Sequence, residues 1–172
     1  MTHCTACRAA RPQSARLLSL FDSLGPIMSG PSSSHTAGAL ALASMARKLF
    51  GEQPERAVFT LYGSFAATGT GHGTDRALVA GLLGLRPDDP RLPDSFALAE
   101  EQGMAFTIHP VELRSAHPNT AVLRLTARSG RELSLKAASV GGGRIRVTEI
   151  DGVPADFGGD SNTLIIHNED TP

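Results

Sequence analysis

Three consecutive serines, a histidine and a threonine lie between two glycines in the stretch Gly30-Pro31-Ser32-Ser33-Ser34-His35-Thr36-Ala37-Gly38. Serine is a preferred N-cap residue, and residues 39–50 are rich in the strong helix formers Ala and Leu. The free N–H groups of a helix start, together with hydroxyl groups, suit a bound carboxylate or phosphate. The simpler alternative is that the serines only cap the helix and that His35 packs on its side. We expect an anion site, because the run holds more donors than a cap requires.

A second polar cluster surrounds His72. Residues 57–62 include β-branched and aromatic residues and predict a strand, which is followed by a loop in which Gly69, Gly71 and Gly73 alternate. This spacing matches neither the dinucleotide fingerprint G-x-G-x-x-G nor a P-loop. An imidazole between two glycines would be unhindered and titrates near neutral pH, which makes proton transfer our hypothesis for His72. A surface histidine without a role is the alternative.

Two further turns carry polar groups. Residues 116–120 include His117 and Asn119, although turn chemistry alone could explain part of this sequence. Residues 139–143 end in Gly141-Gly142-Gly143. Three glycines at the end of a strand predict either a bulge or backbone N–H groups exposed to an anion.

These clusters need a scaffold of helices and strands to position them. Helical spacing places Leu42, Ala46, Leu49 and Phe50 on one face of a helix over 39–50. Further helices are expected at about 76–83, capped by Thr74 and Asp75, and at 95–102; strands are expected at 57–62, 104–111, 121–127, 132–138 and 144–150. The strands 121–127 and 132–138 should form a hairpin around Ser129-Gly130. The order predicts an α+β fold, a mixed β-sheet covered by helices.

The composition of the 172 residues limits the classes of partner. The net charge is −1, aromatic residues make up 5% and there is no Trp, so we expect no nucleic-acid partner. No apolar run approaches the roughly 20 residues of a membrane span, and no signal peptide is visible, so we expect a cytoplasmic protein without a membrane partner. Cys4 and Cys7 have a C-x-x-C spacing, but a second ligand pair is missing, so we expect reduced thiols.

The motifs together resemble one family. In the order found in the β chain of the iron–sulfur-dependent L-serine dehydratases, the chain carries Phe21-Asp22-Ser23-Leu24-Gly25-Pro26, the serine-rich stretch 30–38, Tyr62-Gly63-Ser64-Phe65, Gly71-His72-Gly73-Thr74-Asp75, His117-Pro118-Asn119-Thr120 and Ser139-Val140-Gly141-Gly142-Gly143. The resemblance extends from Leu17 to His167. Each short piece alone would be a weak signal, whereas the ordered set is specific.

The resemblance implies the elimination of water across the α and β carbons of L-serine, giving pyruvate and ammonia. A base removes the α proton, a [4Fe–4S] cluster acts as Lewis acid on the leaving hydroxyl, and the enamine hydrolyses to pyruvate. In this family the cluster is bound by cysteines of the α chain, and nothing in this sequence corresponds to them. We therefore expect this chain to be inactive alone, to act with an L-serine dehydratase α chain, and to assemble as a homo-oligomer of the αβ unit.

Within the resemblance, His72 is the expected catalytic base and His35 the second candidate. No metal ligand is expected in this chain. The expected substrate-binding residues, which offer hydroxyl, side-chain or backbone donors, are Ser32, Ser33, Ser34, Thr36, Gly71, Gly73, Thr74, Asp75, His117, Asn119, Thr120, Gly141, Gly142 and Gly143.

Three regions and one rival function complete these expectations. Residues 1–14 are expected to form a flexible tail and 15–155 a serine dehydratase β domain, which starts with a short apolar segment or helical turn at 17–21. Residues 156–172 are expected to form a linker and the first strand of a truncated ACT-like domain, which 164–172 resembles, with a buried-strand pattern at 163–167. The domain is also similar to the allosteric substrate-binding domain of some 3-phosphoglycerate dehydrogenases. The alternative is therefore a non-catalytic domain that binds serine or another small anionic metabolite. A pure anion sensor would need no base, so His72 distinguishes the two.

Overall fold

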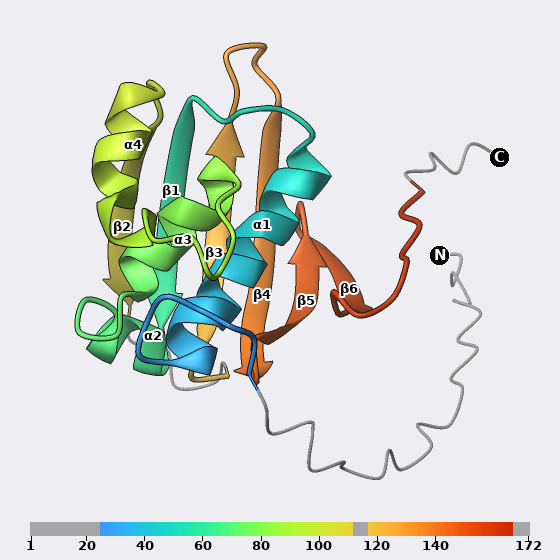
Figure 1. Cartoon of the computed structure of the whole chain (residues 1–172). Helices are drawn as coiled ribbons and strands as arrows, with labels where there is room; N and C mark the ends of the chain where they lie inside the picture. The colour runs from blue at the N-terminus through green and yellow to red at the C-terminus, as the bar shows by residue number, and fades with distance from the viewer. Residues whose placement is uncertain (1–24, 112–116, 167–172) are drawn as a thin grey trace, which may run out of the picture.

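The strands in the described part of the chain form one six-stranded sheet with the order β2-β1-β3-β4-β5-β6. The computed structural model describes residues 25–111 and 117–166 (Figure 1). The strands are β1 (Arg56–Tyr62), β2 (Ala105–Val111), β3 (Thr120–Thr126), β4 (Glu132–Gly141), β5 (Arg144–Ile150) and β6 (Val153–Phe157). β1 and β2 run parallel, and all other neighbouring strands are antiparallel. The expected mixed sheet of an α+β fold is therefore confirmed.

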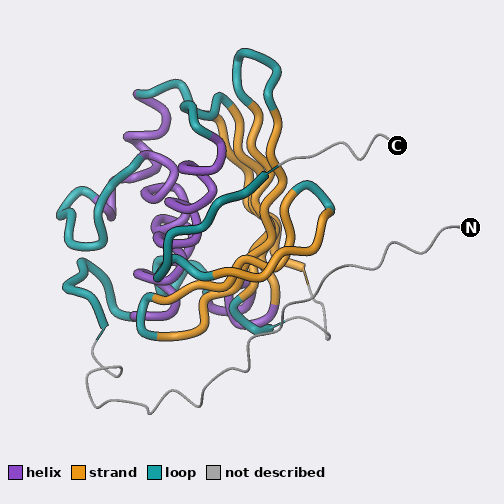
Figure 2. The backbone as a smooth tube through the Cα atoms, turned by 90° about the vertical axis from the view of Figure 1, so that its right-hand side faces the viewer, coloured by secondary structure: helices purple, strands orange, loops and turns teal. Residues whose placement is uncertain are grey.

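The helices lie on one face of this sheet (Figure 2). They are α1 (Gly38–Phe50), α2 (Gly63–Thr68), α3 (Thr74–Leu83) and α4 (Ser95–Glu101), with a π-helical turn at Ser33–Ala37 and a 3₁₀ turn at Leu92–Asp94. On β1, the side chains of Ala57, Phe59 and Leu61 are buried, whereas their neighbours are partly exposed. This alternation places one side of the sheet against the helices.

Helices α1 and α3 pack closely through Gly81. A Cβ atom at Gly81 would lie 2.5 Å from the carbonyl oxygen of Leu40 and 2.7 Å from Cβ of Ala43. Only glycine at this position lets the two backbones approach so closely. The contact fixes the relative position of the helices that carry the two histidine-bearing segments at their N-terminal ends.

Most of the expected elements are confirmed within one or two residues, including the helices after His72 and Ser95 and the hairpin of β3 and β4. Two elements were not anticipated. Helix α2 occupies the first part of the expected glycine-rich loop, and β6 pairs with the edge of β5 where the linker was expected to begin. Segments this short have too weak an apolar periodicity to predict a helix or a strand from sequence.

The buried strand expected at 163–167 is wrong for its described part, residues 163–166. These residues form no helix or strand, and the side chain of Leu164 is 84% exposed. Apolar residues specify a strand only where neighbouring strands pair with them, and no described strand pairs with this segment. His167, the apolar segment 17–21 and the cysteine-bearing leader lie outside the described residues.

Candidate functional site

The polar clusters of the sequence meet at one end of the sheet, where α1 begins and where β1 and β4 end (Figure 1). Short contacts join segments that are far apart in the chain. The hydroxyl of Thr36 donates to the carbonyl oxygen of His72, the N–H of Phe65 donates to the carbonyl of Pro118, and the N–H of Ser139 donates to the carbonyl of Asn119, at 3.0, 3.2 and 3.0 Å. The structure thus brings five of the quoted motifs together.

Two imidazole rings form the chemical centre of this cluster. The ring centroids of His35 and His72 are 5.0 Å apart, and the planes are tilted by 53°. His35 is half-buried, with its ring edge against Phe65 and its Nε2 2.9 Å from Oγ of Ser64. His72 is exposed. One ring is therefore held by the protein, while the other is open to a ligand.

The π-helical turn Ser33–Ala37 orients His35, the half-buried histidine of the pair. Ser32 caps the turn, because its Oγ accepts a hydrogen bond from the backbone N–H of His35 at 3.1 Å, as expected from the sequence. The N–H of Gly38 reaches back to the carbonyl of Ser33, which is the wider spacing of a π-helix. Such turns recur at functional sites, since they change the direction of a few side chains within a helix.

Burial lowers the pKa of His35 below its ordinary value of 6.5. A positive charge on His72 would lower the pKa of His35 further, and a hydrogen bond to Ser64 raises it in part. His35 is therefore neutral at neutral pH. A neutral His35 therefore places no positive charge beside the ring of His72.

The hydroxyls of Thr36 and Thr74, two expected substrate contacts, point into the protein. Thr36 is 1% exposed and Thr74 is fully buried, with no hydrogen-bond partner for its Oγ1 among the described residues. A ligand cannot reach either hydroxyl in this conformation. The expected capping of α3 also differs, since Gly73 is the N-cap, although the carboxylate of Asp75 accepts the N–H of Arg76 at 2.8 Å.

The remaining expected contacts lie around the same end of the sheet. Ser33, Ser34, Gly73 and Asn119 are half-buried, Gly71 is exposed and Thr120 is buried. His117 is exposed, and its Nδ1 accepts the N–H of Asn119 at 3.2 Å. Roles in substrate binding for the exposed and half-buried members of this set stay predictions.

Two residues of the cluster were not singled out as site residues. Ser64 contacts His35, and Ser139 is fully buried beside the start of α1, where a Cβ at Gly38 would lie against its side chain. Both belong to the motifs quoted above, and Ser64 directly follows Gly63 at the end of β1. The position of Ser64, a polar residue just after a central strand, was the sequence signal that could have identified it as a site residue.

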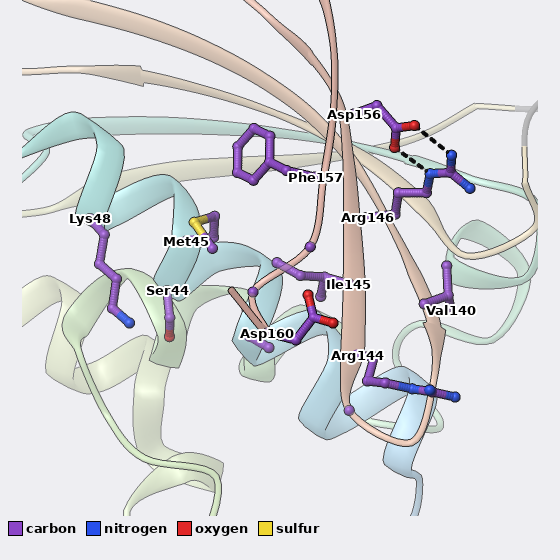
Figure 3. Close-up of a pocket in the computed structure, with 14 residues that line it drawn as sticks. Ser44, Met45, Lys48, Val140, Arg144, Ile145, Arg146, Asp156, Phe157 and Asp160 are labelled. Atoms are coloured by element: carbon purple, nitrogen blue, oxygen red, sulfur yellow. Dashed lines mark hydrogen bonds and ion pairs between the residues drawn. The ribbon is translucent and has the colours of Figure 1, made fainter. Parts of the chain in front are cut away.

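One cavity among the described residues lies beside α1, away from the histidines. It has a volume of about 600 Å³ and is lined by residues of α1, β5, β6 and the segment that follows β6. Figure 3 shows Met45, Ile145 and Phe157 facing its centre, while Arg146 pairs with Asp156 at the edge. Neither histidine of the pair lines this cavity.

The glycines 141–143 form the turn from β4 to β5. Their φ angles are 98°, 61° and 75°, in the left-handed region that favours glycine. A Cβ at Gly143 would lie 3.0 Å from Cδ of Pro26, so this turn also supports the segment that leads to the serine-rich stretch. The turn needs glycine for its backbone shape, and anion binding by its N–H groups stays a prediction.

The described residues contain no group of three or more His, Cys, Asp or Glu side chains placed to hold a metal ion. The histidine pair lacks a third such partner, so these residues do not fit a [4Fe–4S] cluster. None of the described helices is long and apolar enough to cross a membrane.

Comparisons with known proteins identify the family. The model of the serine dehydratase beta chain family matches residues 19–102. The chain is 43% identical over 152 residues to the probable L-serine dehydratase beta chain of Bacillus subtilis, which covers 88% of this chain and 69% of that relative. It is 41% identical over 149 residues to the L-serine dehydratase beta chain of Peptoniphilus asaccharolyticus, with coverages of 86% and 67%. L-serine dehydratase TdcG of Escherichia coli is 35% identical over 167 residues, which are 81% of this chain and 36% of that relative. With its motifs gathered around the histidine pair, the chain belongs to the serine dehydratase beta chain family.

Proposed function

We propose that this chain supplies the proton-transfer and part of the substrate-binding groups of an L-serine dehydratase. Membership of the family makes it the β subunit of an L-serine ammonia-lyase, and the name β chain implies an α chain as partner. The observation that carries the proposed division of roles is the histidine pair, because one exposed imidazole lies 5.0 Å from a half-buried one.

His72 is the proposed base. Its exposed ring lies on a glycine-flanked turn, where the α carbon of serine can approach without steric hindrance. The neutral imidazole takes the α proton, while the β-hydroxyl leaves and a double bond forms between the α and β carbons. His35 stays neutral beside it, since burial lowers its pKa. A positioned base of this kind contributes about 100-fold to 10,000-fold in rate.

The substrate carboxylate is the proposed ligand of the serine-rich stretch. Ser33 and Ser34 are half-buried in the π-helical turn and lie within two residues of His35. Hydroxyl groups and backbone N–H groups at the start of a helix are suitable donors for a carboxylate. We assign Asn119 and the glycine turn 141–143 to the same anion as further donors.

The iron–sulfur cluster is assigned to the α chain. The described residues offer no set of ligands for it, so no step performed by this chain passes through the cluster. L-Serine as substrate, a homo-oligomer of αβ units and a cytoplasmic location belong to the same proposal. Relatives that carry the matching region within a longer L-serine dehydratase support the joint action of the two parts, since only 36% of the E. coli relative is matched.

The test is serine turnover under anaerobic conditions with reconstituted iron–sulfur. The chain alone should form no pyruvate, and addition of the matching α chain should restore pyruvate formation. Pyruvate formation by this chain alone would contradict the shared site. Serine binding by the chain with no turnover in the mixture would favour the metabolite sensor instead.

A further inference from the structure

The hydroxyl of Thr36 joins the two histidine-bearing segments. It donates a 3.0 Å hydrogen bond to the backbone carbonyl of His72, and the two residues are 36 positions apart in the chain. Thr36 is 1% exposed, so the donor of this bond is shielded from water. The bond therefore ties the turn that carries His72 to the π-helical turn that carries His35.

Its surroundings hold the Thr36 side chain in place. Gly30 lies so close that a Cβ atom there would be 2.5 Å from Cγ2 and 2.8 Å from Oγ1 of Thr36. The backbone N–H of Thr36 donates to the carbonyl of Ser32 at 2.9 Å. With the backbone fixed and the methyl group packed against Gly30, the hydroxyl has few alternative directions.

The hydrogen bonds that the backbone N–H groups of the His72 turn donate stay within residues 68–74. They include the bonds from the N–H of His72 to the carbonyl of Thr68 at 3.0 Å and from the N–H of Thr74 to the carbonyl of Gly69 at 2.8 Å. Gly71 and Gly73 flank the histidine and add no side chains. A glycine-flanked backbone needs an external contact to keep one position.

We propose that Thr36 is a positioning residue that sets the distance between the imidazoles of His72 and His35. It does not touch the substrate, because its hydroxyl is buried and directed to the His72 carbonyl. Its catalytic consequence rests on the proposed role of His72 as base, since a base must be held at hydrogen-bond reach of the proton it removes.

Two substitutions separate the hydroxyl from the bulk of the side chain. Thr36→Val keeps the shape and removes the donor, whereas Thr36→Ser keeps the donor and removes the methyl group. In the assembled αβ enzyme we expect Thr36→Val to lower kcat about 10-fold with KM within about 3-fold, because one hydrogen bond is lost and no substrate contact changes. Thr36→Ser should restore kcat to within about 3-fold of the parent.

A matched control is Ser95→Ala. Ser95 is also buried and donates to a backbone carbonyl, that of Arg76, at 2.9 Å, but it contacts neither histidine. This variant should lose thermal stability as Thr36→Val does and keep its kcat. Equal losses of kcat in both variants would reduce Thr36 to a structural residue and overturn the proposal.

A second readout does not depend on turnover. Histidine titration by NMR on the full chain should show the pKa of His35 rising in Thr36→Val, because the His72 ring is no longer held beside it, and returning in Thr36→Ser. Unchanged titration of His35 in Thr36→Val overturns the positioning role. Full activity of His72→Ala would instead refute the proposed base while leaving this titration result intact, so the two failures are distinguishable.

Discussion

Replacement of Gly81 by Ala tests the close contact between the backbones of α1 and α3. An alanine Cβ would lie 2.5 Å from the carbonyl oxygen of Leu40, 2.7 Å from Cβ of Ala43 and 3.0 Å from the backbone N of Ser44. Two of these atoms belong to the backbone of α1 and cannot rotate away. The helices must therefore separate, and forced overpacking of this kind costs about 1–3 kcal/mol.

Helix propensity alone predicts that the same substitution would raise the free energy of unfolding. Alanine stabilises the interior of a helix by about 1 kcal/mol relative to glycine. Because backbone atoms are the obstacle, we take the upper end of the packing cost, about 3 kcal/mol, and expect a net destabilisation of about 2 kcal/mol. For a domain of this size the melting temperature should fall by about 4–8 °C.

Urea unfolding followed by circular dichroism measures the change in the free energy of unfolding. Gly159→Ala is the control, because a Cβ there meets only side-chain carbons, Cε of Met45 at 3.6 Å and Cγ1 of Ile145 at 3.9 Å. It should leave the unfolding midpoint nearly unchanged. Equal or greater stability of Gly81→Ala would show that propensity outweighs packing and would refute the close α1–α3 contact.

Three further predictions concern the histidine pair and the surface. Ser64→Ala removes the hydroxyl 2.9 Å from Nε2 of His35 and should lower turnover of the assembled enzyme by about 3- to 10-fold; unchanged turnover would show that this contact does not orient the pair. Because the pKa of His35 is lowered in the folded state, the unfolded chain binds more protons below pH 6.5, so the free energy of unfolding should fall as the pH drops through that range. In urea titrations at several pH values, His35→Phe should make the free energy of unfolding less dependent on pH. Arg146→Ala breaks an exposed ion pair with Asp156 and should leave the urea midpoint unchanged; a clear drop would show that the pair contributes to stability.

The fold was largely predictable because its longer elements carry periodic apolar patterns. The face of α1 with Leu42, Ala46 and Phe50 is buried, and β3 and β4 pair in the expected hairpin. The apolar run 163–166 shows the limit of such patterns, because burial depends on a neighbouring strand that a local sequence cannot supply. Helix α2 and strand β6 are short, and their boundaries are set by tertiary contacts.

The composition of the site was predictable in part. The sequence singled out His35 and His72, and the structure brings their ring centroids to 5.0 Å. Capping by the serines, the simpler alternative at the sequence level, is observed at Ser32, whose expected role in substrate binding stays a prediction. The sequence could not show that Thr36 and Thr74 point inward, because residue type does not give the direction of a side chain in a π-helical turn or at the start of α3.

Turnover of L-serine by His72→Ala, assembled with the α chain and compared with the parent complex, tests the central claim most directly. We expect assembly to be intact and turnover to fall by at least about 100-fold, because the base that removes the α proton is lost. Retained turnover in the intact complex would contradict the account and transfer the proton-transfer role to His35 or to the α chain.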